Sequence, residues 1–368
     1  MSLAVLGIGT AVPPIRYTQE EAAEWATLVT CQDAEQVKML QVLYRQTHIA
    51  HRHIIHGKDV YDNSVNGRTD DEGLAFRSTG EEDFGPDTAE RMAMYDREVL
   101  PMALDASAQA LDESGIAPSL ITHLITVTCT GFKAPGFDIA LIKNLGLPSS
   151  VERTQVGFMG CHGAFNALRV ARAYAQSHPE ARVLICAAEI CSIHYYYPWN
   201  PKRIVGNALF GDGSAALVGV STELAPDDAW REVANGSCLF PDCEYAMGWE
   251  IGNHGFEMTL SAKVPNLIAN NLKPWLETWL KSHGLAIGDV ASWAIHPGGP
   301  RIIASVEEAL GLIPGVAWAS REVLTQFGNM SSPTVLFILD RLRRSDAPRP
   351  CVALGFGPGL VVEAALFR

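Results

Sequence analysis

The sequence predicts an α/β protein of alternating helix and sheet layers, in the order α/β/α/β/α, formed by two copies of one unit. Three observations lead to this fold class. The chain has 368 residues, 48 % hydrophobic and 19 % charged, which is typical of a globular protein with a large core. Its expected strands are apolar runs with little alternation, as in sheets covered by helices on both faces. Similar residues also recur in the two halves of the chain at a constant separation.

The spacing between the halves is 168 residues. Three pairs of positions are separated by it: Cys161 and Asn329, Gly160 and Gly328, and the strand starts Val183 and Cys351. A constant offset indicates an internal duplication. We therefore predict two halves, residues 1–220 and 221–368, with no separate linker because no Pro/Gly/Ser-rich stretch divides them.

The first elements precede the repeated unit. Residues 1–9 are apolar and predict a first strand, because they lack the basic start of a signal peptide. Thr18 and Glu21 form the pattern of a capping box, which predicts a helix over residues 20–29. Residues 56–87 are polar and acidic. We interpret them as a solvated loop or a short surface helix, with a functional lid as the alternative.

Each copy of the unit is predicted to contain a helix, a strand, a second helix and a second strand. In the first copy these are residues 101–115, residues 121–128, the helix after Cys161 and residues 182–188. In the second copy they are residues 265–283, residues 290–295, the helix after Asn329 and residues 350–355.

Composition excludes several functional classes. A formal net charge of −13 disfavours nonspecific binding to nucleic acid and to acidic membranes, which both require a cationic surface. No apolar run reaches the roughly 18 residues of a membrane span. The eight cysteines are scattered without CxxC pairs, so neither a disulfide framework nor a zinc ribbon is indicated. A reducing cytoplasm is the expected location.

A nucleophilic cysteine is the strongest chemical signal. Cys161 lies in a glycine-flanked turn that opens an alanine-rich helical run, and His296 and Asn329 follow in two more glycine-rich turns. The helix dipole and a nearby imidazolium both lower the pKa of a thiol, so we expect a thiolate at neutral pH. The alternative, a buried structural cysteine, is less favoured because the motif falls at the duplicated position.

Five segments in order carry a family resemblance. They are Gly160-Cys161-His162-Gly163-Ala164, Leu209-Phe210-Gly211-Asp212-Gly213-Ser214-Ala215-Ala216, Ile295-His296-Pro297-Gly298-Gly299-Pro300, Phe327-Gly328-Asn329-Met330-Ser331-Ser332 and Gly355-Phe356-Gly357-Pro358-Gly359-Leu360. Together they resemble the type III polyketide synthases, the chalcone-synthase-like branch of the thiolase superfamily. The resemblance extends from Leu3 to the C-terminus and implies a thiolase-like duplicated fold.

The resemblance implies a reaction and a catalytic trio. A starter acyl group moves from coenzyme A onto Cys161, and malonyl-CoA then extends it by iterative decarboxylative Claisen condensation. His296 and Asn329 are implied to stabilise the enolate oxygen, and His296 also to pair with the thiolate. Coenzyme A thioesters serve as substrates, and no metal or other cofactor is implied.

The resemblance also implies a set of pocket residues. Phe210 matches a gatekeeping phenylalanine, and Met258, or Phe256 in a looser alignment, matches the second gatekeeper. The positions implied to line the cavity are Cys129, Cys191, His194 and Trp249, with Ala134 where plant enzymes carry a methionine that reaches into the partner subunit. Contacts to the phosphates of coenzyme A are reduced to Lys38 and Arg45, which share one helical face.

These departures guide the substrate prediction. Ala134 implies a roomier cavity, and Trp249 in a place held by glycine disfavours a flavonoid-shaped one. We therefore expect a fatty acyl starter that gives an alkylpyrone or an alkylresorcinol. A homodimer is implied by the family alone, and a carrier protein could replace coenzyme A as the donor.

Other functions remain alternatives at this stage. A papain-like hydrolase also uses Cys, His and Asn in this order, but its flanking motifs and early cysteine are absent here. A ketoacyl synthase III-like condensing enzyme shares the fold and the trio, yet would not carry His296-Pro297-Gly298-Gly299. A non-catalytic binder of the same fold is a third option.

Two weaker signals point elsewhere. The histidine cluster at positions 48, 51, 53 and 56 has metal-like spacing, but in an extended segment its members fall on opposite faces, so a polar strand edge is expected. Gly7-Ile8-Gly9 lacks the third glycine of a dinucleotide motif, because position 12 is Val12.

Overall fold

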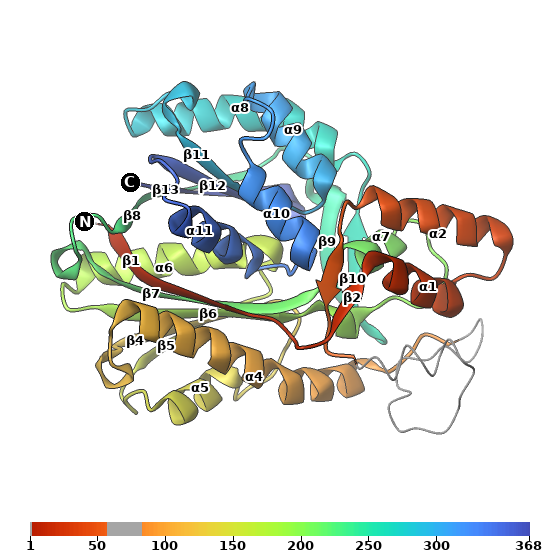
Figure 1. The fold of residues 1–368 in the computed structure, drawn as a ribbon, viewed down its shortest axis with the longest axis horizontal. Helices are drawn as coiled ribbons and strands as arrows, with labels where there is room; N and C mark the ends of the chain where they lie inside the picture. The colour runs from red at the N-terminus through yellow and green to blue at the C-terminus, as the bar shows by residue number, and fades with distance from the viewer. Residues whose placement is uncertain (1, 57–82) are drawn as a thin grey trace.

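The computed structural model describes residues 2–56 and 83–368 (Figure 1). Most of the acidic segment 56–87, with its predicted loop or lid, lies outside the described residues. Nine strands form one mixed sheet in the order β11-β12-β13-β8-β1-β7-β6-β4-β5. Their bounds are β1 (Leu3–Ala11), β4 (His123–Thr128), β5 (Glu152–Gly157), β6 (Arg182–Ile190), β7 (Asp212–Ser221), β8 (Trp230–Leu239), β11 (Ser292–Ile295), β12 (Cys351–Gly357) and β13 (Val361–Phe367).

The sheet repeats one four-strand arrangement. In the first half, β6 is parallel to β4 and antiparallel to β7, which in turn is antiparallel to β1. In the second half, β12 is parallel to β11 and antiparallel to β13, which is antiparallel to β8. Antiparallel pairing of β1 with β8 joins the halves. The duplication is thus present in the topology, while the boundary at residues 220 and 221 stays a prediction.

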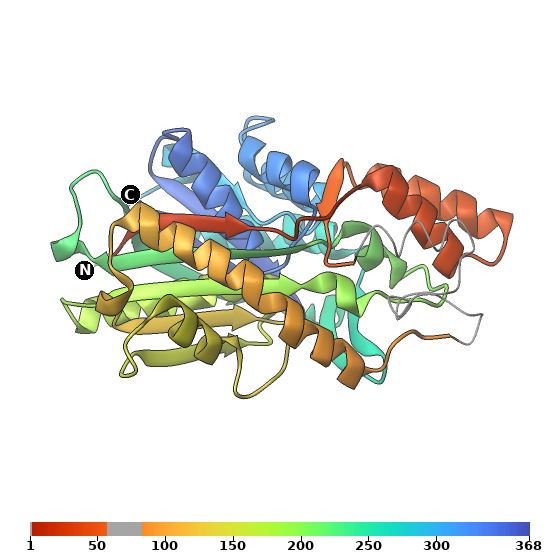
Figure 2. The same cartoon turned by 60° about the horizontal axis from the view of Figure 1, so that its bottom comes forward.

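Helices form three layers around the two portions of the sheet (Figures 1 and 2). Helices α6 (Gly163–Ser177) and α11 (Thr334–Arg344) lie between the portions. Helix α4 (Thr88–Ser114) lies across β1, β6 and β7, and α5 (Phe137–Leu145) lies beside it on the same outer face. Helices α8 (Val264–Ser282) and α9 (Pro300–Leu310) cover the other outer face, and α10 (Trp318–Phe327) packs against α11, α9 and β11. The predicted α/β/α/β/α order, and with it the thiolase-like fold class, is confirmed.

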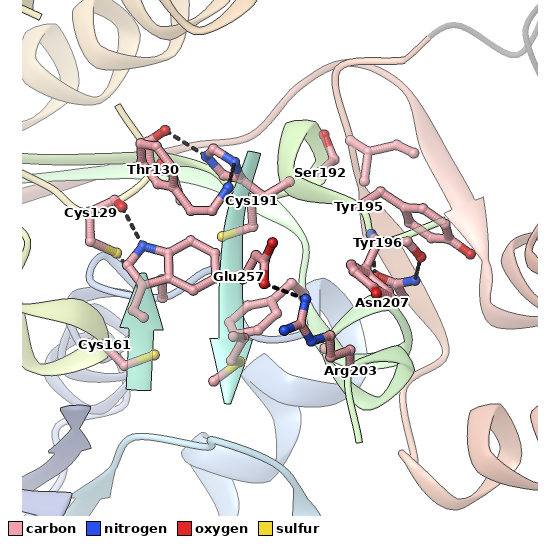
Figure 3. Close-up of a pocket in the computed structure, with 18 of the residues that line it drawn as sticks. Cys129, Thr130, Cys161, Cys191, Ser192, Tyr195, Tyr196, Arg203, Asn207 and Glu257 are labelled. Atoms are coloured by element: carbon pink, nitrogen blue, oxygen red, sulfur yellow. Dashed lines mark hydrogen bonds and ion pairs between the residues drawn. The ribbon is translucent and has the colours of Figure 1, made fainter. Parts of the chain in front are cut away.

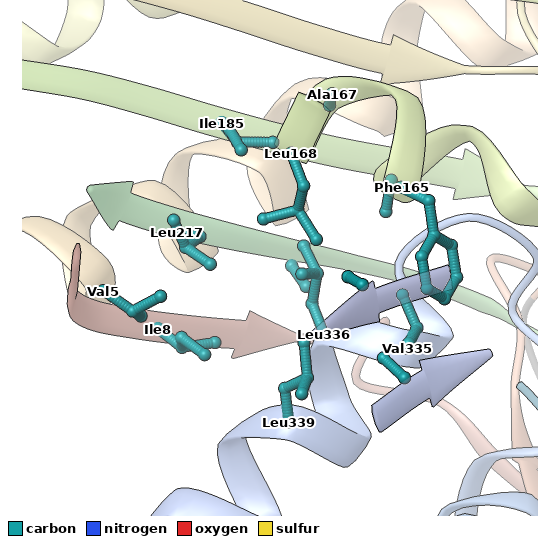
Figure 4. Packing of buried hydrophobic residues seen from close by; sticks show 14 of the residues in the cluster. Val5, Ile8, Phe165, Ala167, Leu168, Ile185, Leu217, Val335, Leu336 and Leu339 are labelled. Atoms are coloured by element: carbon teal, nitrogen blue, oxygen red, sulfur yellow. The ribbon is translucent and has the colours of Figure 1, made fainter. Parts of the chain in front are cut away.

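The central layer forms its own hydrophobic core (Figure 4). Leu168 of α6 and Leu336 of α11 are fully buried, and they pack with Ile8 of β1 and Leu217 of β7 in one cluster. Full burial of such a side chain contributes about 1.5–3 kcal/mol. Because the cluster draws on both halves, the turns at the ends of α6 and α11 are held at fixed positions relative to each other.

Capping residues determine where two of the helices begin. Helix α1 (Gln19–Thr30) begins at the predicted capping box, in which Thr18 and Glu21 bond reciprocally. The prediction for the longest helix was wrong at its start: α4 begins at Thr88, because Asp87 and Glu90 form a second capping box. Pro101, the predicted first residue, lies inside α4.

The shorter elements flank one end of the sheet. They are α2 (Ala34–Gln46), α7 (Ile204–Leu209), β2 (Arg16–Thr18), β3 (His51–His53) and the hairpin of β9 (Met247–Gly252) with β10 (Gly255–Leu260). β3 pairs with β2 in a two-stranded sheet, so His51 and His53 lie on a strand edge as expected, whereas His48 and His56 lie before and after the strand. The part of the chain that the structure describes has no group of three or more metal-ligating side chains. None of its helices combines the length and the apolar character that crossing a bilayer requires.

Candidate active site

Cys161 lies where the chain turns into the central layer. It occupies a short 3-10 turn, η3 (Gly160–His162), which leads directly into α6. Gly160 has φ of 75°, and a Cβ there would come within 2.4 Å of Pro358 Cδ. Glycine is therefore required, since other residues rarely adopt this backbone conformation and would also collide. The turn exposes the Cys161 thiol to the pocket described below.

Asn329 occupies the matching position in the second half. It also follows a left-handed glycine, Gly328, with φ of 72°. Its backbone N–H donates to Leu209 O at 2.9 Å, and its carbonyl accepts from Gly211 N at 3.0 Å, so the turn is fixed to the Phe210 segment. The Asn329 side-chain oxygen accepts from Ser331 N at 2.8 Å. The amide NH₂ is then the donor available to the Cys161 side chain, and Asn329 lowers the pKa of that thiol.

His296 follows the end of β11 and is almost fully buried, with 1 % of its surface exposed. Its backbone N–H donates to Leu354 O at 2.8 Å. Among the described residues, neither ring nitrogen has a hydrogen-bond partner. Burial, and to a lesser degree the nearby His162, lowers the pKa of His296 to about 3. The resting imidazole is therefore neutral.

The electrostatics of Cys161 differ from the expectation. Burial raises the pKa of its thiol to about 11, although hydrogen bonds from Ser331, Asn329 and its own backbone act in the opposite direction. The helix terminus alone does not keep this thiol ionised, because removal from water outweighs it. The predicted resting thiolate therefore requires a proton acceptor, for which His296 is the residue predicted from the sequence.

A pocket opens in front of Cys161 (Figure 3). Its empty space, counted with the solvent at its mouth, is about 1290 Å³. One wall is the β9–β10 hairpin, and another is α7 with the 3-10 turn η4 (Cys191–His194). The pocket continues between α1 and α2, where Trp25 and Tyr44 line it.

Six predicted pocket residues line this cavity: Cys129, Cys191, His194, Phe210, Trp249 and Met258. A Cβ at Gly206 would lie 3.6 Å from the Phe210 ring and 3.8 Å from Met258 Sδ, so both side chains lie beside this glycine of α7. Phe256 instead stacks on His194 with ring centroids 4.2 Å apart. Met258 is thus better placed than Phe256 for the second gatekeeping position.

His194 and Trp249 attach the hairpin to the first half. His194 Nδ1 accepts from Phe256 N at 2.9 Å, and its Nε2 then donates to Thr130 O at 2.7 Å. Trp249 Nε1 donates to Cys129 O at 2.7 Å. Both side chains therefore shape the wall of the pocket instead of projecting freely into it.

The buried His296 and Asn329 are not among the residues that line the pocket. Three further predicted site residues do not line it either. Lys38 and Arg45 are exposed on α2, although the pocket reaches Tyr44 of the same helix. Ala134 is exposed on the loop between β4 and α5. Their predicted contacts with coenzyme A and with a partner subunit stay predictions.

Two functional neighbours were not singled out from the sequence. Ser331 has a left-handed backbone with φ of 61°, lines the pocket, and lies 3.2 Å from Cys129 Sγ through its Oγ. Glu189 is fully buried and accepts from Cys129 N, Thr130 Oγ1 and Ser332 Oγ at 2.9 to 3.0, 2.6 and 2.5 Å. The Phe327–Ser332 motif contained the signal for Ser331, whereas Glu189 lies in an apolar strand without a motif.

Comparison with known proteins identifies the family. The family model for the N-terminal domain of chalcone and stilbene synthases matches residues 2–222, and that for the C-terminal domain matches residues 233–368. The alpha-pyrone synthesis polyketide synthase-like Pks18 of Mycobacterium tuberculosis is 36 % identical over 285 residues, 76 % of this chain and 72 % of that protein. The 1,3,6,8-tetrahydroxynaphthalene synthase of Streptomyces peucetius is 30 % identical over 99 % of this chain and 93 % of its own length.

Solved structures agree with this result. PKS-I of the brown alga Ectocarpus siliculosus superposes with a TM-score of 0.88 at 30 % identity, covering 100 % of this chain and 98 % of its own. The C-terminal type III polyketide synthase domain of Steely1 from Dictyostelium gives a TM-score of 0.89 at 27 % identity, with coverage of 100 % and 99 %. The chain therefore belongs to the chalcone and stilbene synthase family and is a type III polyketide synthase, an acyltransferase.

Proposed function

We propose that Cys161, His296 and Asn329 catalyse iterative decarboxylative condensation of malonyl-CoA onto an acyl-CoA starter bound in this pocket. The observation that carries the proposal is that Cys161 lines this pocket while Asn329 acts on its thiol and lowers its pKa. The residues meet from opposite halves of the duplicated fold, each preceded by a left-handed glycine. A nucleophile and an amide donor thus share one reaction centre.

The proposed first step is transfer of the starter. Cys161 loses its proton to His296 and attacks the thioester carbonyl. The carbon–sulfur bond to coenzyme A then breaks, and the coenzyme leaves as a thiolate that takes up the proton. Since both charges of the Cys161–His296 pair arise together, each offsets part of the cost of burying the other.

The proposed second step is extension. Malonyl-CoA loses carbon dioxide, and the electron pair of the broken carbon–carbon bond forms an enolate. The enolate carbon attacks the acyl carbonyl on Cys161, whose thiolate leaves, and the product is a β-ketoacyl-CoA. Asn329 NH₂ and His296 are the proposed donors to the enolate oxygen, where preorganised donors have their largest effect. The product returns to Cys161 for the next cycle.

A fatty acyl starter is the proposed substrate class. Beyond the Cys161 end, the pocket is lined by apolar and aromatic side chains of α1, α2 and the segment after η4, among them Ala22, Trp25, Tyr44 and Tyr195. A lining of this kind accommodates an alkyl chain. Similarity to a protein named for alpha-pyrone synthesis supports an alkylpyrone, with an alkylresorcinol as the alternative product. We further propose a cytoplasmic homodimer, with a carrier protein as an alternative donor.

The test is product analysis. The purified protein is incubated with malonyl-CoA and a panel of short, long and aromatic acyl-CoAs, and products are analysed by liquid chromatography with mass spectrometry beside Cys161→Ala. We expect long-chain starters to give products that grow in two-carbon units, and the variant to give none. Product formation with short or aromatic starters only would refute the fatty acyl assignment. No product from any starter would refute coenzyme A as the donor.

A further inference from the structure

An ion pair crosses the wall of the pocket. Arg203, the residue that precedes α7, contacts Glu257 of β10 through Nη1, and both side chains line the pocket (Figure 3). The guanidinium also lies 4.8 Å from the centre of the Tyr196 ring. The two side chains are 33 % and 35 % exposed, so the pair is open to a ligand. The catalytic trio does not use it.

Of the two arginines that line this pocket, Arg203 is the more exposed one. Arg52 also lines the pocket, but it is 7 % exposed and its Nη1 donates to the carbonyls of Asn207 and Phe210 at 2.6 and 2.8 Å. Within residues 2–56 and 83–368, Glu257 is the only side chain that accepts from Arg203. A guanidinium has five N–H donors. Nε and Nη2 of Arg203 therefore remain available.

The pair lies close to the two gatekeeping positions. Arg203 and Gly206 are three residues apart at the start of α7, about 4.5 Å along a helix axis and on one face. Gly206 in turn faces Phe210 and Met258. Arg203 therefore lies within one turn of α7 of the two gatekeeping positions, and both Arg203 and Cys161 line the pocket.

Glu257 is positioned by its surroundings. A Cβ at Gly252 would come within 2.5 Å of Glu257 Oε1, so the bare glycine leaves the space that the carboxylate needs. In the hairpin register Glu257 lies opposite Glu250, a like-charge pair that is unfavourable unless one partner is neutralised. Contact with Arg203 supplies that neutralisation. It also leaves the pair without net charge, so its free N–H groups suit neutral acceptors better than a second anion.

We propose that Arg203, held by Glu257, donates hydrogen bonds to the ketone oxygens of the growing poly-β-ketoacyl chain and thereby sets how many condensations precede ring closure. This inference rests on the proposed function. Ketone oxygens are neutral acceptors that recur every second carbon, and a charged donor binds them more strongly than a neutral one.

The chemical consequence concerns lactone formation. To form a pyrone, the enol oxygen on the fifth carbon of the chain, counted from the thioester carbonyl as the first, attacks that carbonyl and closes a six-membered ring. The carbon–sulfur bond breaks, and the enol proton passes to the departing thiolate. A chain whose ketone oxygens are bound by Arg203 is held extended and is less able to fold back. Loss of Arg203 should therefore favour early closure and shift products from tetraketides toward triketide pyrones.

The experiment compares three variants. Arg203→Met removes the donors, and the double variant R203E/E257R retains the ion pair but moves the donors from α7 to β10. Lys202→Met removes an exposed neighbouring cation that does not line the pocket and serves as the control. For each protein, intact-protein mass spectrometry measures acylation of Cys161, and chromatography measures the ratio of tetraketide to triketide products from one acyl-CoA.

We expect the ratio to fall about tenfold in Arg203→Met, the effect of losing one charge-assisted hydrogen bond, and to change also in the double variant. The control should match the wild type. An unchanged ratio in the double variant would show that the pair only links α7 to β10, and an unchanged ratio in Arg203→Met would likewise overturn the proposal. If Arg203→Met does not fold, the product ratio of the double variant alone tests the proposal. Absence of acylation in the wild type would refute the proposed function instead.

Discussion

At the residue scale, the chemistry depends on how a buried thiol becomes ionised. Burial raises the pKa of Cys161 to about 11, so the thiol on its own would be protonated at pH 7. Its hydrogen bonds to Ser331 and Asn329 stabilise the thiolate but do not remove the need for a base. His296 is neutral and lacks a ring partner among the described residues, and it is the proposed proton acceptor.

This argument predicts the effect of removing the base. In His296→Gln, Cys161 must ionise without a partner, so its pKa should rise toward that of an isolated buried thiol. Below the pKa the thiolate fraction changes tenfold per pH unit, and a rise of two units lowers alkylation by iodoacetamide at pH 7 about 100-fold. The rate is measured by intact-protein mass spectrometry from pH 5 to 10, with Cys161→Ala to identify the labelled site. Superimposable pH profiles for variant and wild type would contradict the role of His296.

Sequence reasoning found the residues that motifs mark and missed those that only the fold assembles. Cys161 and Asn329 were predicted because each lies in a glycine-rich turn at matching positions of the two halves, 168 residues apart. Arg203 and Glu257 carry no motif, and they meet only because α7 and the β9–β10 hairpin form facing walls. The prediction that the pKa of Cys161 is lowered was wrong, because burial raises it. A turn motif does not reveal how deeply a side chain is buried.

At the element scale, the close contact of α4 with β1 holds the outer layer in place. A Cβ at Gly9 would come within 2.1 Å of Ala106 O and 2.7 Å of Ala110 N, both backbone atoms of α4. The helix would have to move away from the strand to accommodate any side chain. Gly288 offers a matched position, because a Cβ there meets nothing within 4 Å.

We therefore predict that Gly9→Ala lowers the free energy of unfolding by about 1–3 kcal/mol, the usual cost of overpacking. Gly288→Ala should change it by less than about 0.5 kcal/mol. Urea unfolding followed by circular dichroism measures both. Equal midpoints for the two variants would show that α4 adjusts freely.

The boundary of α4 illustrates the limit of prediction at this scale: Pro101 suggested a start, but the capping box at Asp87 and Glu90 determines where the helix begins.

At the scale of the whole molecule, the duplication was predictable and the pocket was not. A constant offset of 168 residues is visible in sequence, and the repeated strand order follows from it. The pocket instead depends on where α1, α2 and the hairpin lie relative to α7. Tyr44 is the residue of α2 that lines the pocket, whereas Lys38 and Arg45, the predicted coenzyme A contacts on the same helix, are exposed outside it.

The proposed homodimer is the last property at this scale. Phe132 is 65 % exposed and Met159, two residues before Cys161, is 40 % exposed. Phe132 contacts Phe158 with ring centroids 6.3 Å apart, which places this apolar surface beside the active-site turn and on the same loop as Ala134. Large apolar side chains exposed together are typical of a surface that a partner covers. A second copy seated there would bring its Ala134 loop toward the pocket.

If this surface is the dimer interface, a charge on it should separate the subunits. We expect light scattering to give twice the chain mass of 39.9 kDa for the wild type and values approaching a single chain for Phe132→Asp. Ile313→Asp serves as the control, because Ile313 is 80 % exposed on the connection between α9 and α10. Burying an unpaired carboxylate at an apolar interface costs several kcal/mol, whereas an exposed one costs little. A dimeric Phe132→Asp would place the interface elsewhere, and a monomeric wild type would refute the homodimer.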